Sequence, residues 1–239
     1  MTGAARKDTR WYGRRRGKKL RPGRQALLDT LLPEIKLCPP SDGGSDWLAE
    51  SFSPPPADIW LEIGFGAGEH LYAQACAHSD VGFIGCEPFV NGVASLLAQI
   101  DAGGASNIRI FDDDVRLVLD ALPDASIGRL FVLFSDPWPK RRHQRRRLIS
   151  TESLDQFARL LRDGAEFRFA SDHMEFVRWT LERTVHHPAF SWPALGRSDW
   201  SRAPDDWVQT RYEAKALEHG RHPVYLRFLR RSRNEARGD

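Results

Sequence analysis

The most distinctive side chains in this sequence lie in a short stretch where an acid, an aromatic ring and a cation follow one another. Asp136, Trp138 and Lys140 alternate with Pro137 and Pro139, directly after a strongly apolar run. The two prolines fix φ and remove N–H donors, so they stiffen the loop. A carboxylate that accepts hydrogen bonds and an indole that stacks are the groups that grip a planar nucleobase. The alternative is that Trp138 is a core residue and the loop is only structural.

Three glycines, Gly64, Gly66 and Gly68, follow another apolar segment and predict a tight turn that approaches a ligand closely. A dinucleotide fingerprint would need its third glycine at position 69, where this chain has Glu69. An acid there would repel a pyrophosphate at the helix N-terminus. With Glu62 two residues before the run, the pattern favours S-adenosylmethionine, a cationic ligand without phosphate. A plain tight turn is the alternative.

Acidic residues also stand after the next two apolar segments. Glu87 follows the glycines by about 20 residues, a position from which a carboxylate can accept both hydroxyls of a ribose. It could instead be an acid that begins the next helix. Asp112, Asp113 and Asp114 form a cluster, and Asp114 could accept a hydrogen bond from an adenine amino group. Such a cluster also suits Mg²⁺ or Ca²⁺, but no second group of ligands is implied nearby, so we expect no metal.

These candidate residues all follow segments that predict strands. Strands are expected at residues 58–63, 81–86, 107–111, 130–135 and 166–170, followed by helices at 69–77, 90–100, 115–121, 151–161 and 175–184. Five strand–helix pairs predict an α/β fold whose parallel sheet is covered on both faces and binds ligands beyond the carboxyl ends of its strands. A helix at 25–37 precedes this pattern, and a Trp/Pro-rich stretch, a helix at 212–219 and a strand at 224–229 follow it.

Charge in the 239-residue chain is concentrated in two basic segments, although the formal net charge is only +3. Residues 1–24 hold ten Lys or Arg against one acid, and Lys140–Arg147 hold six Lys or Arg and no acid. The remainder carries a net charge of −12. An acidic body with two basic patches predicts a polyanionic partner, nucleic acid first. We expect residues 1–24 to form a flexible arm, either a solvated tail or an RNA-binding segment, and residues 25–239 to form one domain.

Cysteine usage and hydropathy indicate the compartment. Cys38, Cys76 and Cys86 form no CxxC pair and are odd in number, which argues against a disulfide scaffold and against a cysteine-rich zinc site. No apolar run approaches the roughly 18 residues of a membrane helix, and no apolar h-region follows the N-terminal charges. We therefore expect a cytoplasmic protein that does not engage a membrane.

Taken together, the segments resemble the bacterial tRNA (guanine-N7-)-methyltransferase family from about Arg21 to Leu229. The resemblance rests on residues 61–68, 85–88, 135–140, 142–143, 145–147, 171–173 and 210–213. It implies the Rossmann-like class I methyltransferase fold, with a seven-stranded, mostly parallel sheet and an antiparallel last strand. It also implies S-adenosylmethionine as methyl donor and tRNA as acceptor, with the modified guanine at position 46 of the variable loop.

The same resemblance implies roles for individual residues. The positions implied to contact S-adenosylmethionine are Glu62, Glu87, Asp114 and Asp136. Those implied to contact the substrate are Lys140, Asp172, Thr210, Arg211, Tyr212 and Glu213. Ser171 stands where threonine is common and Phe176 where tyrosine is common; both changes leave the reaction class untouched.

The chemistry of guanine explains why no general base is evident in the sequence. Guanine N7 carries an in-plane lone pair and no proton, so it can attack a sulfonium methyl group directly. The purine becomes cationic, so the enzyme must supply alignment and negative charge. Asp136 fits a catalytic carboxylate that accepts from N1–H and N2–H₂, and Asp172 fits a similar purpose. His143 and His173 are expected to be RNA-contacting or structural.

Three other functions share part of this pattern. A methyltransferase acting on a small molecule or a protein would share the glycines and Glu87 but would not need the basic run at 140–147, and a methyltransferase acting on another RNA is a further alternative. A non-enzymatic RNA-binding module would have damaged cofactor positions, whereas these positions are intact. A NAD-dependent oxidoreductase is disfavoured by Glu69. The sequence implies no obligate protein partner and leaves both monomer and homodimer open.

Overall fold

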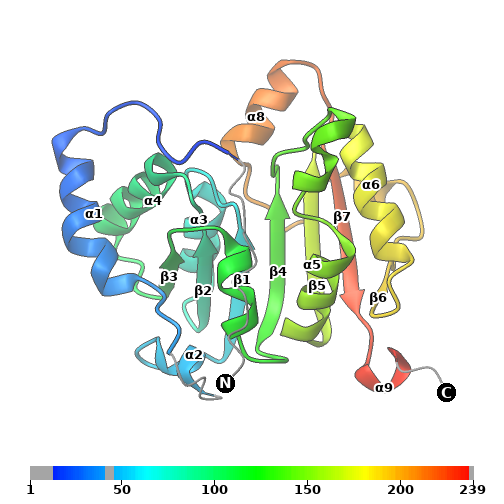
Figure 1. The fold of residues 1–239 in the computed structure, drawn as a ribbon, viewed down its shortest axis with the longest axis horizontal. Coiled ribbons are helices and arrows are strands. Elements are labelled where there is room, and N and C mark those ends of the chain that lie inside the picture. Colours follow the sequence, from blue (N-terminus) through cyan, green and yellow to red (C-terminus); the bar gives the residue numbers. More distant parts are fainter. Residues whose placement is uncertain (1–12, 41–45, 237–239) are drawn as a thin grey trace.

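A mixed seven-stranded sheet forms the centre of the protein (Figure 1), whose computed structural model describes residues 13–40 and 46–236. The strands are β1 (Asp58–Ile63), β2 (Val81–Cys86), β3 (Ile108–Phe111), β4 (Ile127–Leu133), β5 (Leu161–Ser171), β6 (Phe190–Ser191) and β7 (Val224–Arg230). Their order is β3-β2-β1-β4-β5-β7-β6, and β7 runs antiparallel to both β5 and β6. This topology confirms the expected seven-stranded sheet with an antiparallel last strand.

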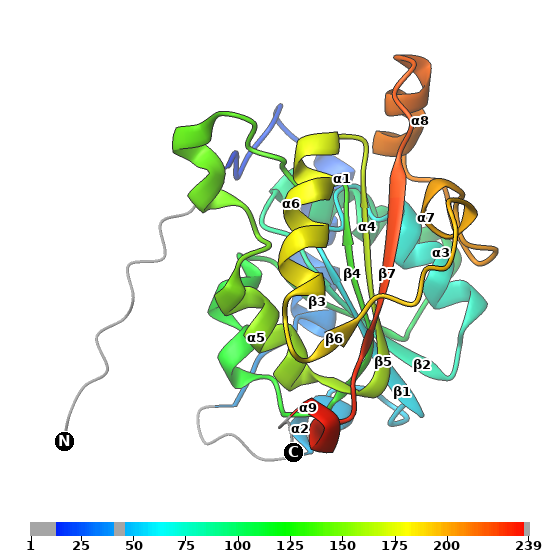
Figure 2. The same cartoon turned by 90° about the vertical axis from the view of Figure 1, so that its right-hand side faces the viewer.

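Helices cover both faces of the sheet, as Figure 2 shows from the side. The longer ones are α1 (Pro22–Ile35), α3 (Glu69–Ala77), α4 (Val90–Gly103), α5 (Thr151–Leu160), α6 (Met174–Val185) and α8 (Arg211–Glu218). Shorter helices are α2 (Trp47–Glu50), α7 (Ser198–Ser201) and α9 (Arg233–Ala236). None of the helices in the described part of the chain combines the length and apolar character needed to cross a membrane.

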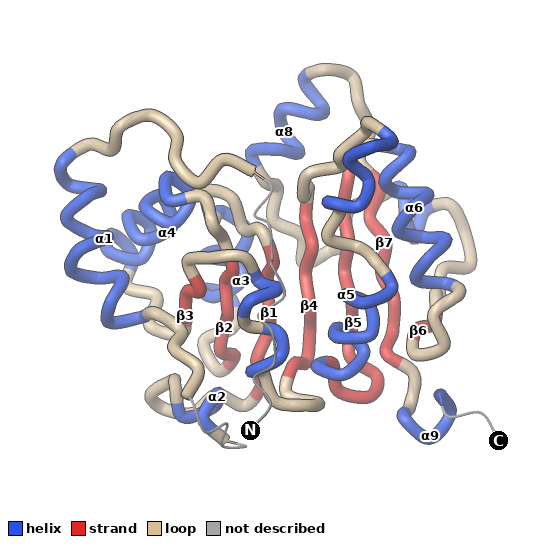
Figure 3. Tube along the Cα trace, in the orientation of Figure 1, coloured by secondary structure: helices blue, strands red, loops and turns tan. Residues whose placement is uncertain are grey.

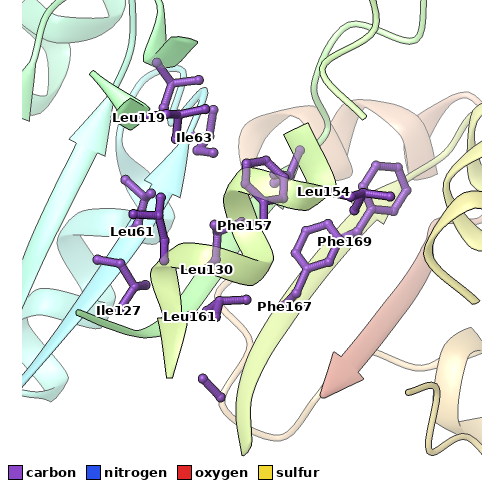
Figure 4. Packing of buried hydrophobic residues seen from close by; sticks show 14 of the residues in the cluster. Leu61, Ile63, Leu119, Ile127, Leu130, Leu154, Phe157, Leu161, Phe167 and Phe169 are labelled. Atoms are coloured by element: carbon purple, nitrogen blue, oxygen red, sulfur yellow. The ribbon is translucent and has the colours of Figure 1, made fainter. Parts of the chain in front are cut away.

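Alternation along the strands divides the core into two clusters, one on each face. In β1, Leu61 and Ile63 pack on the face covered by α5 and α6, whereas Trp60 packs on the face covered by α1, α3 and α4. Figure 4 shows Leu61 of β1, Leu130 of β4 and Phe157 of α5 in the first cluster. Parallel strands buried on both faces are typically continuous apolar runs of this kind.

The structure departs from the expected elements at the ends of some strands and in several short elements. Residues 115–121, expected as a helix, form two 3-10 turns; Asp114 caps the first at its N-terminus, and Val118 separates the two. β4 begins and ends earlier than residues 130–135, and β5 is longer than 166–170. β6 and α2 were not expected; β6 has two residues and exists through its pairing with β7.

The N-terminal segment at residues 13–20 lies along the start of α4. Val90 donates its backbone N–H to the Arg15 carbonyl at 2.9 Å. Asn91 accepts from the Gly17 N–H at 2.7 Å and donates to the Lys18 carbonyl at 2.8 Å. α1 then begins at Pro22, a residue type suited to the first helical position. The boundary expected at residue 24 therefore falls inside α1, and residues 1–12 of the expected arm lie outside the described part of the chain.

Candidate active site

A cavity of about 380 Å³ opens at the carboxyl ends of β1, β2 and β4. Figure 3 shows that the loops after these strands gather at one end of the sheet. Five of the residues expected to bind the cofactor line this cavity: Gly64, Gly66, Glu87, Asp114 and Asp136. Two others do not line it, Glu62 and Gly68. The topology therefore brings together acids that are separated by up to 49 positions in the sequence.

The glycine loop after β1 forms the floor of the cavity. Gly66 has φ +59 and donates its N–H to Glu87 Oε2 at 2.8 Å. A Cβ on Gly66 would lie 3.0 Å from Tyr212 Cε2, so the missing side chain lets the tyrosine ring lie on the loop. Gly64 has φ +76, and a Cβ there would meet nothing within 4 Å. The backbone at Gly64 is thus open to a ligand.

Helix α4 packs closely against the same glycine loop. A Cβ on Gly92 would lie 2.2 Å from the Gly66 carbonyl oxygen, so α4 approaches the loop as closely as a glycine allows. Gly68 begins α3 at φ +87, and a Cβ there would lie 2.8 Å from Leu96 of α4. Gly68 therefore serves the packing of α4 against the loop rather than the cavity surface.

Glu87 is the most perturbed acid of the site. It is buried, and its two carboxylate oxygens accept backbone N–H groups from Gly66 and Phe89, each at 2.8 Å. Burial raises the pKa of Glu87 from 4.5 to about 7, the two backbone hydrogen bonds oppose this rise, and negative charge on Asp136 and Glu62 adds to it. A carboxylate has about four lone-pair sites, so Glu87 retains acceptors for a ligand.

Asp136 lies at the cavity mouth in the loop after β4. Its side chain is exposed, and partial desolvation raises its pKa. Two non-glycine residues of this loop have positive φ, Phe134 at +50 and Trp138 at +42. The Trp138 ring lies on the cavity wall, 5.8 Å from the His143 ring centroid and 5.0 Å from the Arg146 guanidinium. The alternative that Trp138 belongs to the core is wrong.

Each carboxylate of the aspartate cluster after β3 forms an ion pair with a different cation. The pairs are Lys36–Asp112 at 2.7 Å, Arg15–Asp113 at 3.1 Å and Arg116–Asp114 at 2.6 Å. Asp114 also caps the turn that follows, by accepting from the Arg116 N–H. Within the described ranges, no group of three or more His, Cys, Asp or Glu side chains is placed to hold a metal ion.

Glu62 lies behind the glycine loop, away from the cavity wall. Its buried carboxylate is 2.7 Å from the Nδ1 atom of His70, which is also buried. The His70 ring packs against Phe131 and Trp207 at centroid distances of 4.9 and 5.5 Å. The structure thus places Glu62 in a buried pair that supports the loop. Sequence reasoning missed His70, whose only signal was a histidine in the first turn of the helix after the glycines.

The segment 210–213 contains one cavity residue, two structural residues and the exposed Arg211. Tyr212 lines the cavity. Thr210 and Glu213 form a reciprocal capping box that begins α8. Glu213 is buried and accepts from Trp207 Nε1 at 2.6 Å and from the Tyr225 hydroxyl at 2.5 Å. In the described structure Thr210 and Glu213 therefore hold α8 in place, and Tyr212 faces the ligand side.

The other residues expected to contact the substrate lie outside the cavity wall. Lys140 and Arg211 are exposed. Asp172, just after β5, pairs with Arg221 at 3.0 Å. These three residues are available to a substrate larger than the cavity. Sequence reasoning also missed several lining residues, namely Arg14, Phe89, Arg116, Phe134 and Arg146.

The basic residues at 140–147 differ in their exposure to solvent. Lys140, Arg141, Arg142 and Arg145 are exposed, and residues 141–146 form a 3-10 helix beside the cavity. Arg147, the last residue of the run, is buried, so its side chain is not exposed to a polyanionic partner in this structure.

Comparisons with known proteins agree with this geometry. Residues 56–226 match a family model described as "Putative methyltransferase". The tRNA (guanine-N(7)-)-methyltransferase of Rhodospirillum rubrum is 58% identical over 95% of this chain and 89% of its own length. The protein of that name from Brucella anthropi is 48% identical over 92% and 94%.

Solved structures share the fold at low identity. A 16S rRNA (adenine(1408)-N(1))-methyltransferase from Catenulisporales acidiphilia aligns with a TM-score of 0.54 at 17% identity, covering 83% of this chain and 97% of its own. An antibiotic-related methyltransferase aligns with the same TM-score at 18% identity, over 78% and 93%. These likenesses concern the fold, whereas the high-identity relatives span nearly the whole chain together with its glycine loop and Asp136 loop. The chain therefore belongs to the bacterial tRNA (guanine-N7-)-methyltransferase family.

Proposed function

We propose that this protein transfers the methyl group of S-adenosylmethionine to N7 of a guanine in tRNA. One observation carries the proposal: a cavity floored by glycines and lined by Glu87, Asp114 and Asp136 opens directly beside the Asp136–Trp138 loop and an exposed basic helix. A small acceptor would need the cavity alone. The basic helix at its mouth suits a polyanionic acceptor, and the names of the relatives identify tRNA.

The residues that line the cavity fit S-adenosylmethionine. The open backbone at Gly64 admits a ligand, and Glu87 retains acceptor sites for ribose hydroxyls. The carboxylates of Glu87, Asp114 and Asp136 line the cavity beside the cations Arg14, Arg116 and Arg146. Such a mixed lining suits a ligand that carries sulfonium and ammonium charges together with a carboxylate. When bound, this cofactor supplies an electrophilic methyl group on sulfur.

The chain's own residues orient the guanine and stabilise its new charge. Asp136 accepts hydrogen bonds from guanine N1–H and N2–H₂, which fixes the plane of the base and presents its N7 edge. The same carboxylate stabilises the positive charge that develops on the purine. Trp138 offers a ring on which the base stacks. No residue has to remove a proton, because N7 carries none.

The exposed cations beside the cavity bind the tRNA backbone in this proposal. Lys140, Arg141, Arg142 and Arg145 lie on one short stretch within reach of successive phosphates. If roughly five phosphates are neutralised, the log–log dependence of tRNA binding on salt should have a slope of about −3.5 to −4.5. A slope near zero in filter binding between low and high salt would remove these residues from the proposal.

A methyl-transfer assay tests the function directly. Purified protein is incubated with labelled S-adenosylmethionine and unmodified tRNA, and mass spectrometry identifies the product nucleosides and their position. We expect 7-methylguanosine, at position 46 of the variable loop. The Asp136→Ala variant should lose activity by at least ~10²-fold, with a smaller loss of cofactor affinity, because a charge used mainly in the transition state is removed.

Asp101→Ala is the matched control, since Asp101 is exposed on α4 and does not line this cavity. Equal turnover in Asp136→Ala and Asp101→Ala would refute the role of Asp136. Cofactor binding without transfer to tRNA would redirect the proposal to another RNA, a small molecule or a protein.

A further inference from the structure

The last arginine of the basic run differs from its neighbours in exposure. Arg141, Arg142 and Arg145 are exposed, whereas the side chain of Arg147 has a relative accessibility of 0%. A phosphate cannot reach a guanidinium that no solvent reaches unless the surrounding chain opens. Arg147 therefore has a different task from the other cations of the run.

The Arg147 guanidinium binds the backbone of the Asp136 loop. Its Nε donates to the Pro137 carbonyl at 2.8 Å, and Nη2 donates to the Trp138 carbonyl at 3.3 Å. Glu175 of α6 faces it from the other side, with Nη1–Oε1 at 3.1 Å and a second, shorter contact from Nη2 to Oε2. Four of the five N–H donors are thus used, two by a carboxylate and two by the carbonyls that follow Asp136.

Aromatic rings of α6 complete the surroundings of Arg147. The guanidinium lies 4.6 Å from the Trp179 ring centroid and 5.4 Å from that of Phe176, distances at which a cation is attracted to a ring face. Trp179 is itself fixed by its Nε1–H, which donates to the Ile149 carbonyl at 2.8 Å. The guanidinium is therefore held by α6 while it holds the loop.

The loop to which Arg147 is hydrogen-bonded has two residues in an unfavourable backbone conformation. Phe134 and Trp138 have φ of +50 and +42, and non-glycine residues keep such values only where the surroundings enforce them. At one end, the Phe134 N–H donates to the Ala170 carbonyl of β5 at 2.8 Å. At the other end, the Trp138 carbonyl accepts from Arg147. Asp136 lies between these two anchors.

We propose that Arg147 is a positioning residue: together with Glu175 it fixes the backbone of the Asp136–Trp138 segment from inside the fold and contacts no RNA phosphate. The catalytic part of this inference rests on the proposed function, because Asp136 must act on the guanine. The structural part does not. A planar fork is required, since lysine presents three donors from a single atom and cannot serve two carbonyls and both carboxylate oxygens at once.

Hydrogen–deuterium exchange of Arg147→Lys tests the structural part without any substrate. We expect exchange in the peptide that spans residues 134–140 to be at least ~10-fold faster than in the parent, with the central strands unchanged. Arg178→Lys makes the same substitution at an exposed position of α6 and should match the parent. Parent-like exchange of residues 134–140 in Arg147→Lys would overturn the proposal.

Kinetics and salt dependence separate positioning from phosphate contact. Arg147→Lys should lower kcat for tRNA methylation by at least ~10-fold, with little change in the KM for tRNA, because the displaced group acts on the reacting base. In Arg147→Met, which removes the charge, the salt slope of tRNA binding should equal that of the parent. Arg145→Ala should make the slope shallower by about 0.7–0.9.

A slope reduced in Arg147→Met as much as in Arg145→Ala would refute the inference. A parent enzyme that fails to methylate tRNA would refute the proposed function, while the exchange experiment would still decide the structural role of Arg147. If Arg147→Met does not fold, Arg147→Lys provides the decisive comparison.

Discussion

Replacing Glu87 with glutamine should change how the stability of the protein depends on pH. Burial raises the pKa of this carboxyl in the folded protein to about 7, from 4.5 in the unfolded chain. Between these values the folded state keeps a proton that the unfolded state has lost, so stability falls as the pH rises. Integration over the two pKa values gives a destabilisation by Glu87 of about 1 kcal/mol at pH 5 and about 3 kcal/mol at pH 8.

The Glu87→Gln substitution removes the ionisable carboxyl group but keeps the shape of the side chain. Its amide can accept from only one of the two N–H groups that Glu87 serves, Gly66 and Phe89, which carries a cost of its own. That cost does not depend on pH, so it cancels when the two pH values are compared. Relative to the parent, Glu87→Gln should therefore gain roughly 2 kcal/mol of unfolding free energy between pH 5 and pH 8.

Urea denaturation of the cofactor-free protein at both pH values measures this quantity. Glu34→Gln, at an exposed position on α1, controls for the loss of one carboxylate from the surface. The argument fails if the stability difference between Glu87→Gln and the parent is the same at pH 5 and at pH 8.

Two further predictions concern the cofactor cavity. Affinity for S-adenosylmethionine, measured by calorimetry, should rise up to ~10-fold from pH 6 to pH 8, because a cationic ligand prefers the ionised Glu87, whose pKa is about 7. The Glu87→Gln variant should show no such rise. An equal rise in the variant and the parent would contradict the reasoning. Gly92→Ala should weaken cofactor binding by ~10-fold and lower Tm, since its Cβ would lie 2.2 Å from the Gly66 oxygen. Gly23→Ala, where a Cβ meets nothing within 4 Å, is its control, and equal affinities would refute this contact argument.

The sequence predicts the sheet well because its strands are short, apolar and bounded by turn residues. β1 and β2 begin and end at the predicted residues, as does α3 between them. Local signals also place Glu87, Asp114 and Asp136 at strand ends. Because ligands bind beyond the carboxyl ends of parallel strands, these three acids are predicted to share one site, and all three line the cavity. Residues at strand ends are therefore predictable without any knowledge of side-chain contacts.

Contacts between distant segments could not be predicted in the same way. Arg147 has the same sequence signal as Arg145, and only the packing of α6 onto the loop decides that one is buried and the other exposed. Likewise, the sequence does not show that α3 brings His70 to the Glu62 carboxylate, and the cofactor contact of Glu62 stays a prediction. Residue type gave the chemistry of these groups, but tertiary packing decided what each of them faces.

The N-terminal segment that lies along α4 has a practical consequence for anyone who shortens the chain. Gly13 and Arg14 line the cofactor cavity, and the following residues are tied to Val90 and Asn91. A truncation made to remove the basic stretch before α1, for instance to reduce nucleic acid carried through purification, would also remove part of the cavity wall. A protease site placed after residue 13 to release a purification tag would likewise remove Gly13 from the cavity wall. Weak cofactor binding by such a preparation would then result from the missing residues and not from the native site.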